Sequence, residues 1–458
     1  MGSPPEIPTG YTVFDIILSV FYSLVLIIVA TSIRNANVDK HPHFRYIVGG
    51  LVVKIIGAAS LCSVYLFYYG GGDTLGYFYN GNVLARLFFK EPLIFFRIVF
   101  LRDCTRETFS YFTHETGEPY HWFFSDPLTY FIPRFISVFE IISFENYLAT
   151  SILITAISYT GLWKLYTVFV EEFPELKKEM AIAVLFVPSV FFWGSGILKD
   201  PITISAVGWY TYAFYHFFVK KRFRLSFIIY LVVSSYIMLA IKPYIFYALI
   251  PGSLVWSLFD FLKRVKGGFM KVAVFPMFLA VFFVIGYFVL TKLGSDKGNY
   301  SLSYLMEYST LVNIDLKKVN FGASSFDLGD YDPTISGMLS KAPQAINAAL
   351  FRPYLWEVKN VIMLISALEN TVILFLVIQL IIKMKFLKTM VFIAENPLQL
   401  FCVFFVLLFS FSVGVTTSNF GSLVRYKIPA MPFFIASIFI MRYYNQKERE
   451  AAMMGTKK

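Results

Sequence analysis

The residues of this chain that could do chemistry are charged side chains embedded in apolar sequence. The pair Lys199-Asp200 follows a Gly-Ser-Gly turn (residues 194–196) and interrupts an apolar stretch over residues 180–219. A charge at membrane depth costs a few kcal/mol or more, so it is rarely kept without a function or a partner. An adjacent cation and anion can bind an anionic group or orient a reacting one. Asp200 can also cap the helix expected to begin at Pro201, while Lys199 snorkels to the membrane surface.

A second acid, Asp73, follows three glycines at residues 70–72, directly after an apolar run. The glycines allow the backbone to turn sharply where it leaves the membrane. Asp73 is then presented near the bilayer surface, where it could remove a proton from an attacking hydroxyl. The alternative is a loop entry in which Asp73 caps the next helix.

Three cations occupy comparable positions in the sequence. Lys242 interrupts another apolar run, while Arg352 and Arg425 precede predicted spans. Arginine binds phosphate oxygens with two parallel hydrogen bonds and lysine acts as a point charge, so these side chains suit a phosphate or pyrophosphate group. The alternative for each is a salt bridge to Asp73, Asp200 or Glu357, or a contact with lipid phosphate.

Other polar residues carry weaker signals. Glu369 lies inside a predicted span, which makes it a candidate for intramembrane support, with Lys54 or a loop cation as its partner. The acidic run at 326–332 could supply oxygen ligands to a divalent cation but lacks the calcium-loop pattern, which favours a solvated loop. His114 and His121 have no metal-ligand spacing, so no metal site is predicted. No Walker A or dinucleotide-binding motif occurs, so no nucleotide cofactor is expected.

Composition predicts a membrane protein. Hydrophobic residues make up 57% of the chain and charged residues 15%, whereas soluble domains have about 25% charged residues. The net charge of +11 fits cytoplasmic anchoring residues and does not indicate nucleic acid. We expect an all-α polytopic protein with about 11 transmembrane helices, near residues 12–33, 46–69, 147–169, 180–197, 202–219, 225–241, 245–262, 269–291, 361–382, 398–416 and 428–441.

Basic clusters follow every second predicted span, and they end with the tail at 442–458. The positive-inside rule then predicts an N-terminus outside and a C-terminus in the cytoplasm. The outer side would hold two long loops, 70–146 and 291–360, and would place Lys199-Asp200 level with Asp73. Apolar and charged residues alternate over 83–101 and 128–142, which predicts interfacial helices. The expected modules are an extra first span with its loop (1–45), a transmembrane module (46–290), the second outer loop (291–360) and the C-terminal spans (361–458).

This order of motifs resembles the polyprenyl-phosphate-dependent integral-membrane glycosyltransferases of the GT-C fold, and the related bacterial polysaccharide polymerases. The resemblance covers roughly residues 46–440, with the additional first span as a departure. It rests on a span leading to Gly72-Asp73, a long first outer loop, Lys199-Asp200 in a tight outer turn, the run Leu350-Phe351-Arg352-Pro353, and Arg425-Tyr426 ahead of Pro429 and Pro432.

The resemblance implies transfer of a sugar from a polyprenyl-(pyro)phosphate-linked donor to a glycan, lipid or protein acceptor, on the periplasmic side of a bacterial inner membrane. Asp73 would be the base, with Asp200 orienting it or binding a divalent cation. Lys199, Lys242, Arg352 and Arg425 would hold the departing phosphate, where fixed cations lower the barrier.

Two other functions fit the same residues. A transporter or flippase for an anionic lipid-linked substrate would use the cations as a translocation site, but the predicted charges lie at one face rather than at the midplane. A non-catalytic envelope scaffold would use the outer loops for docking, and Asp73 would then be dispensable.

Overall fold

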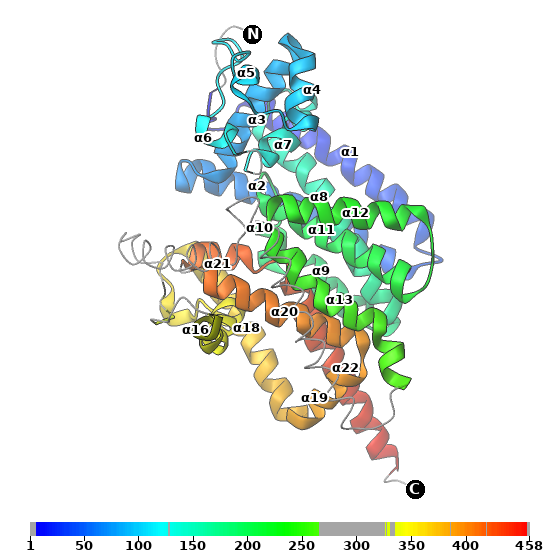
Figure 1. The fold of residues 1–458 in the computed structure, drawn as a ribbon. Helices are drawn as coiled ribbons and strands as arrows, with labels where there is room; N and C mark the ends of the chain where they lie inside the picture. Colours follow the sequence, from blue (N-terminus) through cyan, green and yellow to red (C-terminus); the bar gives the residue numbers. More distant parts are fainter. Residues whose placement is uncertain are drawn as a thin grey trace. The chain divides into compact units, whose positions relative to one another are not determined.

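The structure is a computed structural model that describes residues 6–126, 129–264, 326, 328–329, 335–384, 386–417 and 419–455. Every regular element in this part of the chain is helical (Figure 1). The chain forms two compact units. Unit 1 comprises Met1–Glu172, Leu185–Ala213 and Ile228–Pro243, and unit 2 comprises Phe173–Val184, Phe214–Phe227 and Tyr244–Lys458.

Unit 1 contains the N-terminal helices. In chain order they are α1 (Val13–Asn37), η1 (Pro42–Tyr46), α2 (Ile47–Ser63), η2 (Val64–Tyr69), α3 (Asp73–Lys90), α4 (Pro92–Leu101), α5 (Arg106–Phe109), α6 (His121–Phe124), α7 (Phe131–Ile142), α8 (Tyr147–Glu172), α10 (Pro188–Trp193), most of α11 (Lys199–Phe214) and most of α12 (Leu225–Ile241).

Unit 2 contains the remaining helices. They are η3 (Pro174–Leu176), most of α9 (Lys177–Leu185), η4 (Tyr215–Val219), nearly all of α13 (Pro243–Arg264), α16 (Ile335–Ser340), α17 (Ala342–Phe351), η6 (Leu355–Glu357), α18 (Val361–Met384), α19 (Phe386–Glu395), α20 (Pro397–Thr416), α21 (Phe420–Tyr426) and α22 (Met431–Gly455).

Among the described residues, five helical segments are long and apolar enough to cross a membrane, and they match predicted spans. They are Val13–Asn37, Pro42–Tyr69, Tyr147–Glu172, Val361–Met384 and Pro397–Thr416. A sixth is the pair Phe420–Tyr426 and Met431–Ala451, bent by 65° at the break between them. These apolar helices indicate a membrane protein.

The predicted count of about 11 spans is not confirmed. The predicted span 180–197 is divided between α9 and α10, because Pro188 ends the first helix and begins the second. The span predicted at 202–219 is α11 continued by the π-helical η4, and the next two correspond to the shorter apolar segments Leu225–Ile241 (α12) and Pro243–Phe259 (within α13). The span predicted at 269–291 lies outside the described residues.

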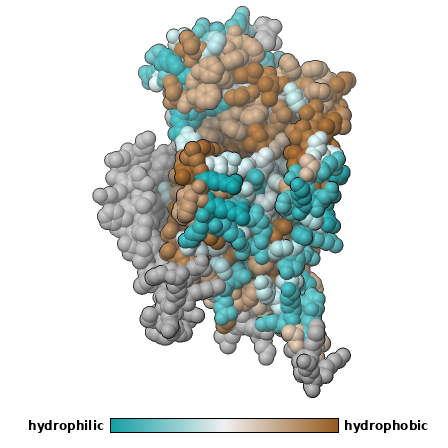
Figure 2. Space-filling model, turned by 90° about the vertical axis from the view of Figure 1, so that its right-hand side faces the viewer, coloured by the Kyte–Doolittle hydropathy of each residue, from teal (hydrophilic) through white to brown (hydrophobic). Residues whose placement is uncertain are grey.

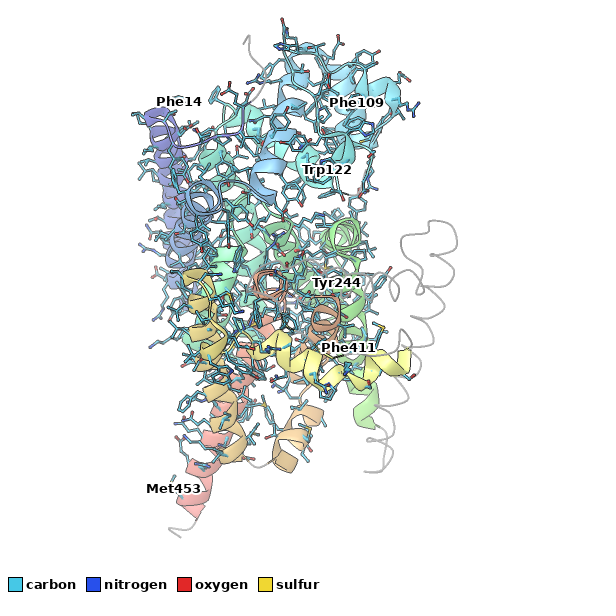
Figure 3. The ribbon with its side chains drawn as sticks, turned by 90° about the vertical axis from the view of Figure 1, so that its left-hand side faces the viewer. Phe14, Phe109, Trp122, Tyr244, Phe411 and Met453 are labelled. Carbon is cyan, nitrogen blue, oxygen red and sulfur yellow. The ribbon has the colours of Figure 1, made fainter. Side chains whose placement is uncertain are left out.

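The first helix presents its apolar side chains outward. A capping box starts α1, in which Thr12 Oγ1 accepts from the Asp15 N–H and the Asp15 carboxylate accepts from the Thr12 N–H. Only 11% of the residues in the most apolar 18-residue stretch of α1 are buried. Phe14, near the beginning of the helix, is 57% exposed (Figure 3). Such broad apolar areas, also visible on the face drawn in Figure 2, suit contact with lipid tails.

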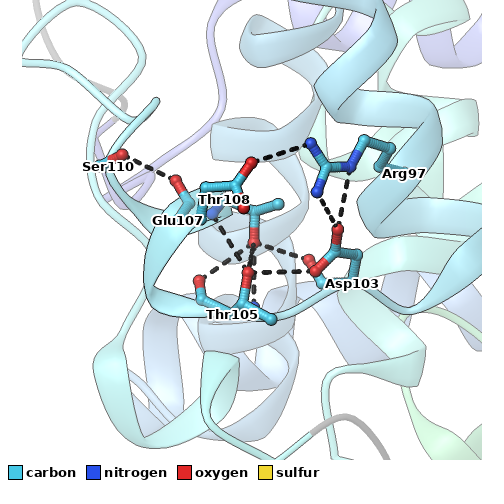
Figure 4. A network of polar contacts seen from close by, with 6 residues as sticks. All are labelled: Arg97, Asp103, Thr105, Glu107, Thr108 and Ser110. Atoms are coloured by element: carbon cyan, nitrogen blue, oxygen red, sulfur yellow. Dashed lines mark hydrogen bonds and ion pairs between the residues drawn. The ribbon is translucent and has the colours of Figure 1, made fainter.

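The 70–146 segment folds into packed helices. The predicted interfacial helix 83–101 is wrong in its boundaries: α3 already begins at Asp73, and α4 is a separate helix because Pro92 cannot continue α3. The predicted helix 128–142 corresponds to α7. After α4, Arg97 donates to Asp103 at 2.6 Å and to Glu107 at 3.1 Å and so ties down the following loop (Figure 4).

The contact between α3 and α7 brings a glycine against a buried carboxylate. A Cβ on Gly81 would lie 2.3 Å from Oε2 of Glu140, so a larger residue there would require the Glu140 side chain to move. Both carboxylate oxygens of Glu140 are buried without a hydrogen-bond partner. Burial, and secondarily the charge of Glu145, raises the pKa of Glu140 well above its ordinary value.

The helices α8 and α11 also pack through glycines. A Cβ on Gly161 would lie 2.2 Å from the carbonyl oxygen of Ser205, and one on Gly208 would lie 2.0 Å from that of Gly161. The two backbones therefore touch, as in the small-residue packing common between membrane helices.

We expect Gly161→Ala to destabilise the protein by about 1–3 kcal/mol, because the added methyl group meets backbone that cannot move aside. The measurement is thermal unfolding of the purified protein in detergent. Gly49→Ala is the matched control, since its Cβ meets only the Phe186 ring at 3.6 Å. Equal stability of the two variants would contradict the proposed backbone contact.

We expect Glu140→Gln to stabilise the protein by about 1–3 kcal/mol at pH 7, because it removes a buried acid that resists ionisation. The pKa of Glu140 is higher in the folded than in the unfolded protein. The wild type therefore loses stability as pH rises from about 4, because folding then opposes ionisation of Glu140, while the glutamine variant does not. The stability difference between the variant and the wild type should vanish near pH 4. Unfolding measured from pH 4 to 8 tests this, with the exposed Glu107→Gln as a control that stays unchanged throughout.

Candidate functional site

The turn between α10 and α11 is built around glycines. Gly196 adopts a left-handed backbone conformation (φ +70°), and its N–H donates to Thr155 Oγ1 at 2.8 Å. The positive φ favours glycine at this position, and a Cβ there would also lie 2.8 Å from Leu61 Cδ2 and displace that side chain. This turn therefore packs against α2 and α8.

Lys54 stabilises the same turn from inside α2. Its side chain is fully buried, and its ammonium donates to the Gly194 carbonyl oxygen, which also accepts from Ser158 Oγ at 3.0 Å. Ser195 Oγ donates back to the Lys54 carbonyl at 3.2 Å. From the sequence, Lys54 was predicted only as a possible partner of Glu369. A lysine inside a strongly apolar span could have indicated that it binds a buried polar group such as this carbonyl.

The turn leads directly into a buried ion pair. Asp200 lies in the first turn of α11 and is completely buried, and its carboxylate pairs with the ammonium of Lys242, which is 6% exposed. The α11 N-terminus favours a negative charge at this position. Lys199 is half-buried beside the pair. The structure thus brings together two of the sequence-predicted residues, Asp200 and Lys242, next to Lys199 in the chain.

The turn before this ion pair lies part-way along two neighbouring helices. It contacts α2 at Leu61, eight residues before η2 ends at Tyr69, and α8 at Thr155, eight residues after that helix begins. Eight helical residues correspond to about 12 Å. That Lys199-Asp200 is level with Asp73 at the outer side stays a prediction.

Asp73 is an exposed side chain at the beginning of α3. Gly70 (φ +61°) and Gly72 (φ +110°) both adopt the left-handed region as the chain leaves η2. The glycines therefore make the predicted sharp turn, and Asp73 occupies the first helical turn after the cap residue Gly72.

A shared apolar core connects Asp73 with the ion pair. Leu75, Ile197 and Ile202 belong to one cluster of buried residues, and Ile241 packs against it. Each of these four apolar residues lies within three positions along the chain of a candidate site residue, namely Asp73, Lys199, Asp200 or Lys242. One rigid core thus supports all the candidate residues of unit 1.

In unit 2, Arg352 has a carboxylate partner, as one sequence-based alternative stated. Its guanidinium pairs with Glu357, which also accepts from the Tyr354 N–H at 2.8 Å. The same guanidinium lies over the rings of Phe326 and Phe420, at 5.0 and 5.1 Å from their centres. Arg352 is held in place on several sides.

A second polar cluster in unit 2 surrounds Lys427, which was not among the predicted site residues. Lys427 is 1% exposed and donates to Asn370 Oδ1 at 2.5 Å, and it interacts electrostatically with Glu369. The loop cation expected as a partner of Glu369 is therefore Lys427. Arg425, two residues earlier, is half-buried, with its guanidinium 5.6 Å from the Tyr426 ring centre.

Within the described residues, no group of three or more His, Cys, Asp or Glu side chains is arranged to hold a metal ion. Asp327, Asp330 and Asp332 lie outside those residues. No protein-family model matches the chain, and no curated protein or solved structure is significantly similar to it.

We expect Lys242→Met and Asp200→Leu each to destabilise the protein by about 3–5 kcal/mol, because either leaves one buried charge without its partner. The double variant should recover most of that loss. Thermal unfolding in detergent measures all three. Lys90→Met, from an exposed ion pair with Glu115, is the control and should have little effect. Additive losses in the double variant would contradict this coupling.

Proposed function

We propose that this protein is a membrane glycosyltransferase or polysaccharide polymerase that uses a polyprenyl-(pyro)phosphate-linked donor. The observation that carries the proposal is the arrangement in unit 1. An exposed carboxylate, Asp73, begins the segment after a span, and the apolar core beneath it also supports the Lys199, Asp200 and Lys242 cluster. Sugar transfer from a phosphate requires an accessible base and cations for the leaving group, and we propose that Asp73 and this cluster supply them.

In the proposed reaction, the Asp73 carboxylate accepts the proton of an acceptor hydroxyl. The hydroxyl oxygen attacks the anomeric carbon of the donor sugar. The bond from that carbon to the phosphate oxygen breaks, and the phosphate leaves with the electron pair. Lys199 and Lys242 would stabilise the negative charge that develops on the leaving group. The phospho-sugar bond supplies the energy.

The geometry favours a positioning role for Asp200. Its carboxylate is completely buried and paired with Lys242, so it fixes the ammonium rather than presenting an acid to substrate. For Arg352 and Arg425, which lie in unit 2, phosphate binding stays a prediction from the sequence. For Arg352, phosphate would have to share a guanidinium already held by Glu357. A bound divalent cation is also compatible with this proposal.

The proposed setting is a bacterial inner membrane, with the N-terminus and the 70–146 segment on the periplasmic side. About 11 spans would place the basic tail in the cytoplasm. The partners would be the lipid-linked donor, membrane lipid and an acceptor glycan, lipid or protein.

A transporter or flippase of an anionic lipid-linked substrate is the second candidate. The burial of the Asp200–Lys242 pair beside the break between α10 and α11 favours it, because buried charges at broken helices often mark translocation sites. Reconstitution into liposomes tests it. Movement of a labelled polyprenyl-phosphate sugar between leaflets, unaffected by Asp73→Asn, would support transport over transfer.

We expect Asp73→Asn to lower the rate of sugar transfer by about 10²- to 10⁴-fold, because it removes the general base. The assay uses purified protein, a short-chain polyprenyl-phosphate sugar and mixed glycan acceptors, with the glycan profile of cells as a second readout. Glu107→Gln is the matched control, since its carboxylate is also exposed in the 70–146 segment. Unchanged transfer or glycans in the Asp73 variant at normal protein levels would refute catalysis by this residue.

A further inference from the structure

A strongly basic turn joins η4 to α12 in unit 2. Four of the five positions at 220–224 are cations, namely Lys220, Lys221, Arg222 and Arg224. All four are exposed. No Asp or Glu occurs at residues 201–259, and across the described residues Lys221, Arg222 and Arg224 form no ion pair. The turn therefore presents positive charge to its surroundings.

The backbone of this basic turn is held in a fixed conformation. The Lys220 N–H donates to the Tyr215 carbonyl at 2.8 Å, and the Arg222 N–H donates to the His216 carbonyl at 2.9 Å, so the turn closes the end of η4. Between them, Lys221 adopts a left-handed backbone conformation (φ +56°). Glycine usually occupies such a position after a helix, because it has no penalty for a positive φ. A lysine there costs stability, and strained residues of this kind cluster at functional positions.

Large apolar side chains are exposed on both sides of the cations. Phe218 is 42% exposed, and Phe223 and Leu225 are each 72% exposed. The Phe217 ring contacts those of Phe218 and Phe223, with ring centres 4.9 and 5.1 Å apart. Leu225 begins α12, an apolar helix of 17 residues. The surface of the turn thus combines cations with apolar groups that lack a cover.

This combination discriminates among the partners of a basic surface. An acidic peptide or free phosphate would neutralise the cations but leave the apolar side chains in water. A nucleic acid could stack on the two rings but would leave Leu225 and the apolar helix behind it uncovered. An anionic phospholipid offers a phosphate to the cations and acyl chains to Phe218, Phe223 and Leu225. Long basic side chains at the end of an apolar helix also reach the headgroup level.

We propose that the turn at residues 220–224 binds an anionic phospholipid, with Lys221, Arg222 and Arg224 at the headgroup phosphate and Phe223 among the acyl chains. Arginine suits this phosphate because it can donate two parallel hydrogen bonds to it. In the proposed topology the lipid lies in the cytoplasmic leaflet. The inference does not rest on the proposed sugar transfer, because a transporter or a scaffold with the same turn would bind the lipid equally.

The experiment measures lipid binding to the full-length protein in detergent, without sugar donor or acceptor. Native mass spectrometry counts the bound phosphatidylglycerol and phosphatidylcholine, of the same acyl chains, over a range of lipid concentrations. We expect the wild type to bind phosphatidylglycerol more tightly. One cation near an anionic membrane surface contributes a factor of about 5 in affinity. Lys221→Gly should therefore weaken phosphatidylglycerol binding about 5-fold, and Lys221→Gly combined with Arg224→Gln about 30-fold.

Two further variants test the specificity of the site. Phe223→Ser should weaken phosphatidylglycerol binding about 3- to 10-fold, because the ring no longer packs among acyl chains. Arg106→Gln combined with Lys178→Gln is the matched control, since it removes two exposed cations elsewhere in the chain. This control should bind phosphatidylglycerol as the wild type does.

Thermal unfolding without lipid verifies that each variant is folded. Lys221→Gly should be at least as stable as the wild type, because glycine suits the positive φ. Its weaker binding would then report on the lost charge rather than on misfolding. The inference is overturned if phosphatidylcholine binds as tightly as phosphatidylglycerol, or if the control variant loses as much binding as the turn variants. It is also overturned if pyrophosphate displaces the lipid at equal concentration, since the turn would then be a site for free phosphate.

Discussion

The structure of unit 1 depends on how polar groups are satisfied where the backbone turns at membrane depth. The break between α10 and α11 frees carbonyl groups that lipid cannot pair. Lys54 and Ser158 both donate to the Gly194 carbonyl, and Thr155 accepts from the Gly196 N–H. With the turn fixed in this way, Asp200 is held at the start of α11, where Lys242 neutralises it.

In the proposed reaction, the glycine turns and the shared apolar core would hold the exposed Asp73 and the buried Asp200–Lys242 pair in fixed positions. Asp73 owes its accessibility to the glycines before α3, and its position to Leu75 in the apolar core. The Lys242 ammonium owes its position to Asp200. Preorganised charges of this kind are effective because they need no rearrangement as negative charge develops. Because the Lys242 ammonium is paired with Asp200, its charge would be partly neutralised toward a bound phosphate. Lys199 would be the more accessible positive charge.

Much of the fold could be predicted because hydrophobic runs of span length determine helices wherever they occur. The helices at 13–37, 147–172, 361–384 and 397–416 follow from such runs. Prediction was poorer where proline divides a run, as at Pro188 and Pro92, since hydropathy averages over the break. It also missed the roles of Lys54 and Lys427, whose partners are distant in the chain.

The sequence by itself determined the helical membrane class, the glycine turn before Asp73 and the presence of charges within apolar segments, because composition and local backbone preferences are read from neighbouring residues. Only the tertiary structure decided the partners. Asp200 pairs with Lys242 and Arg352 with Glu357, while Lys54 donates to the carbonyl oxygen of Gly194. The physical reason is that pairing and burial depend on which helices pack together, through close contacts such as that of Gly161 with Ser205, and no local pattern encodes these.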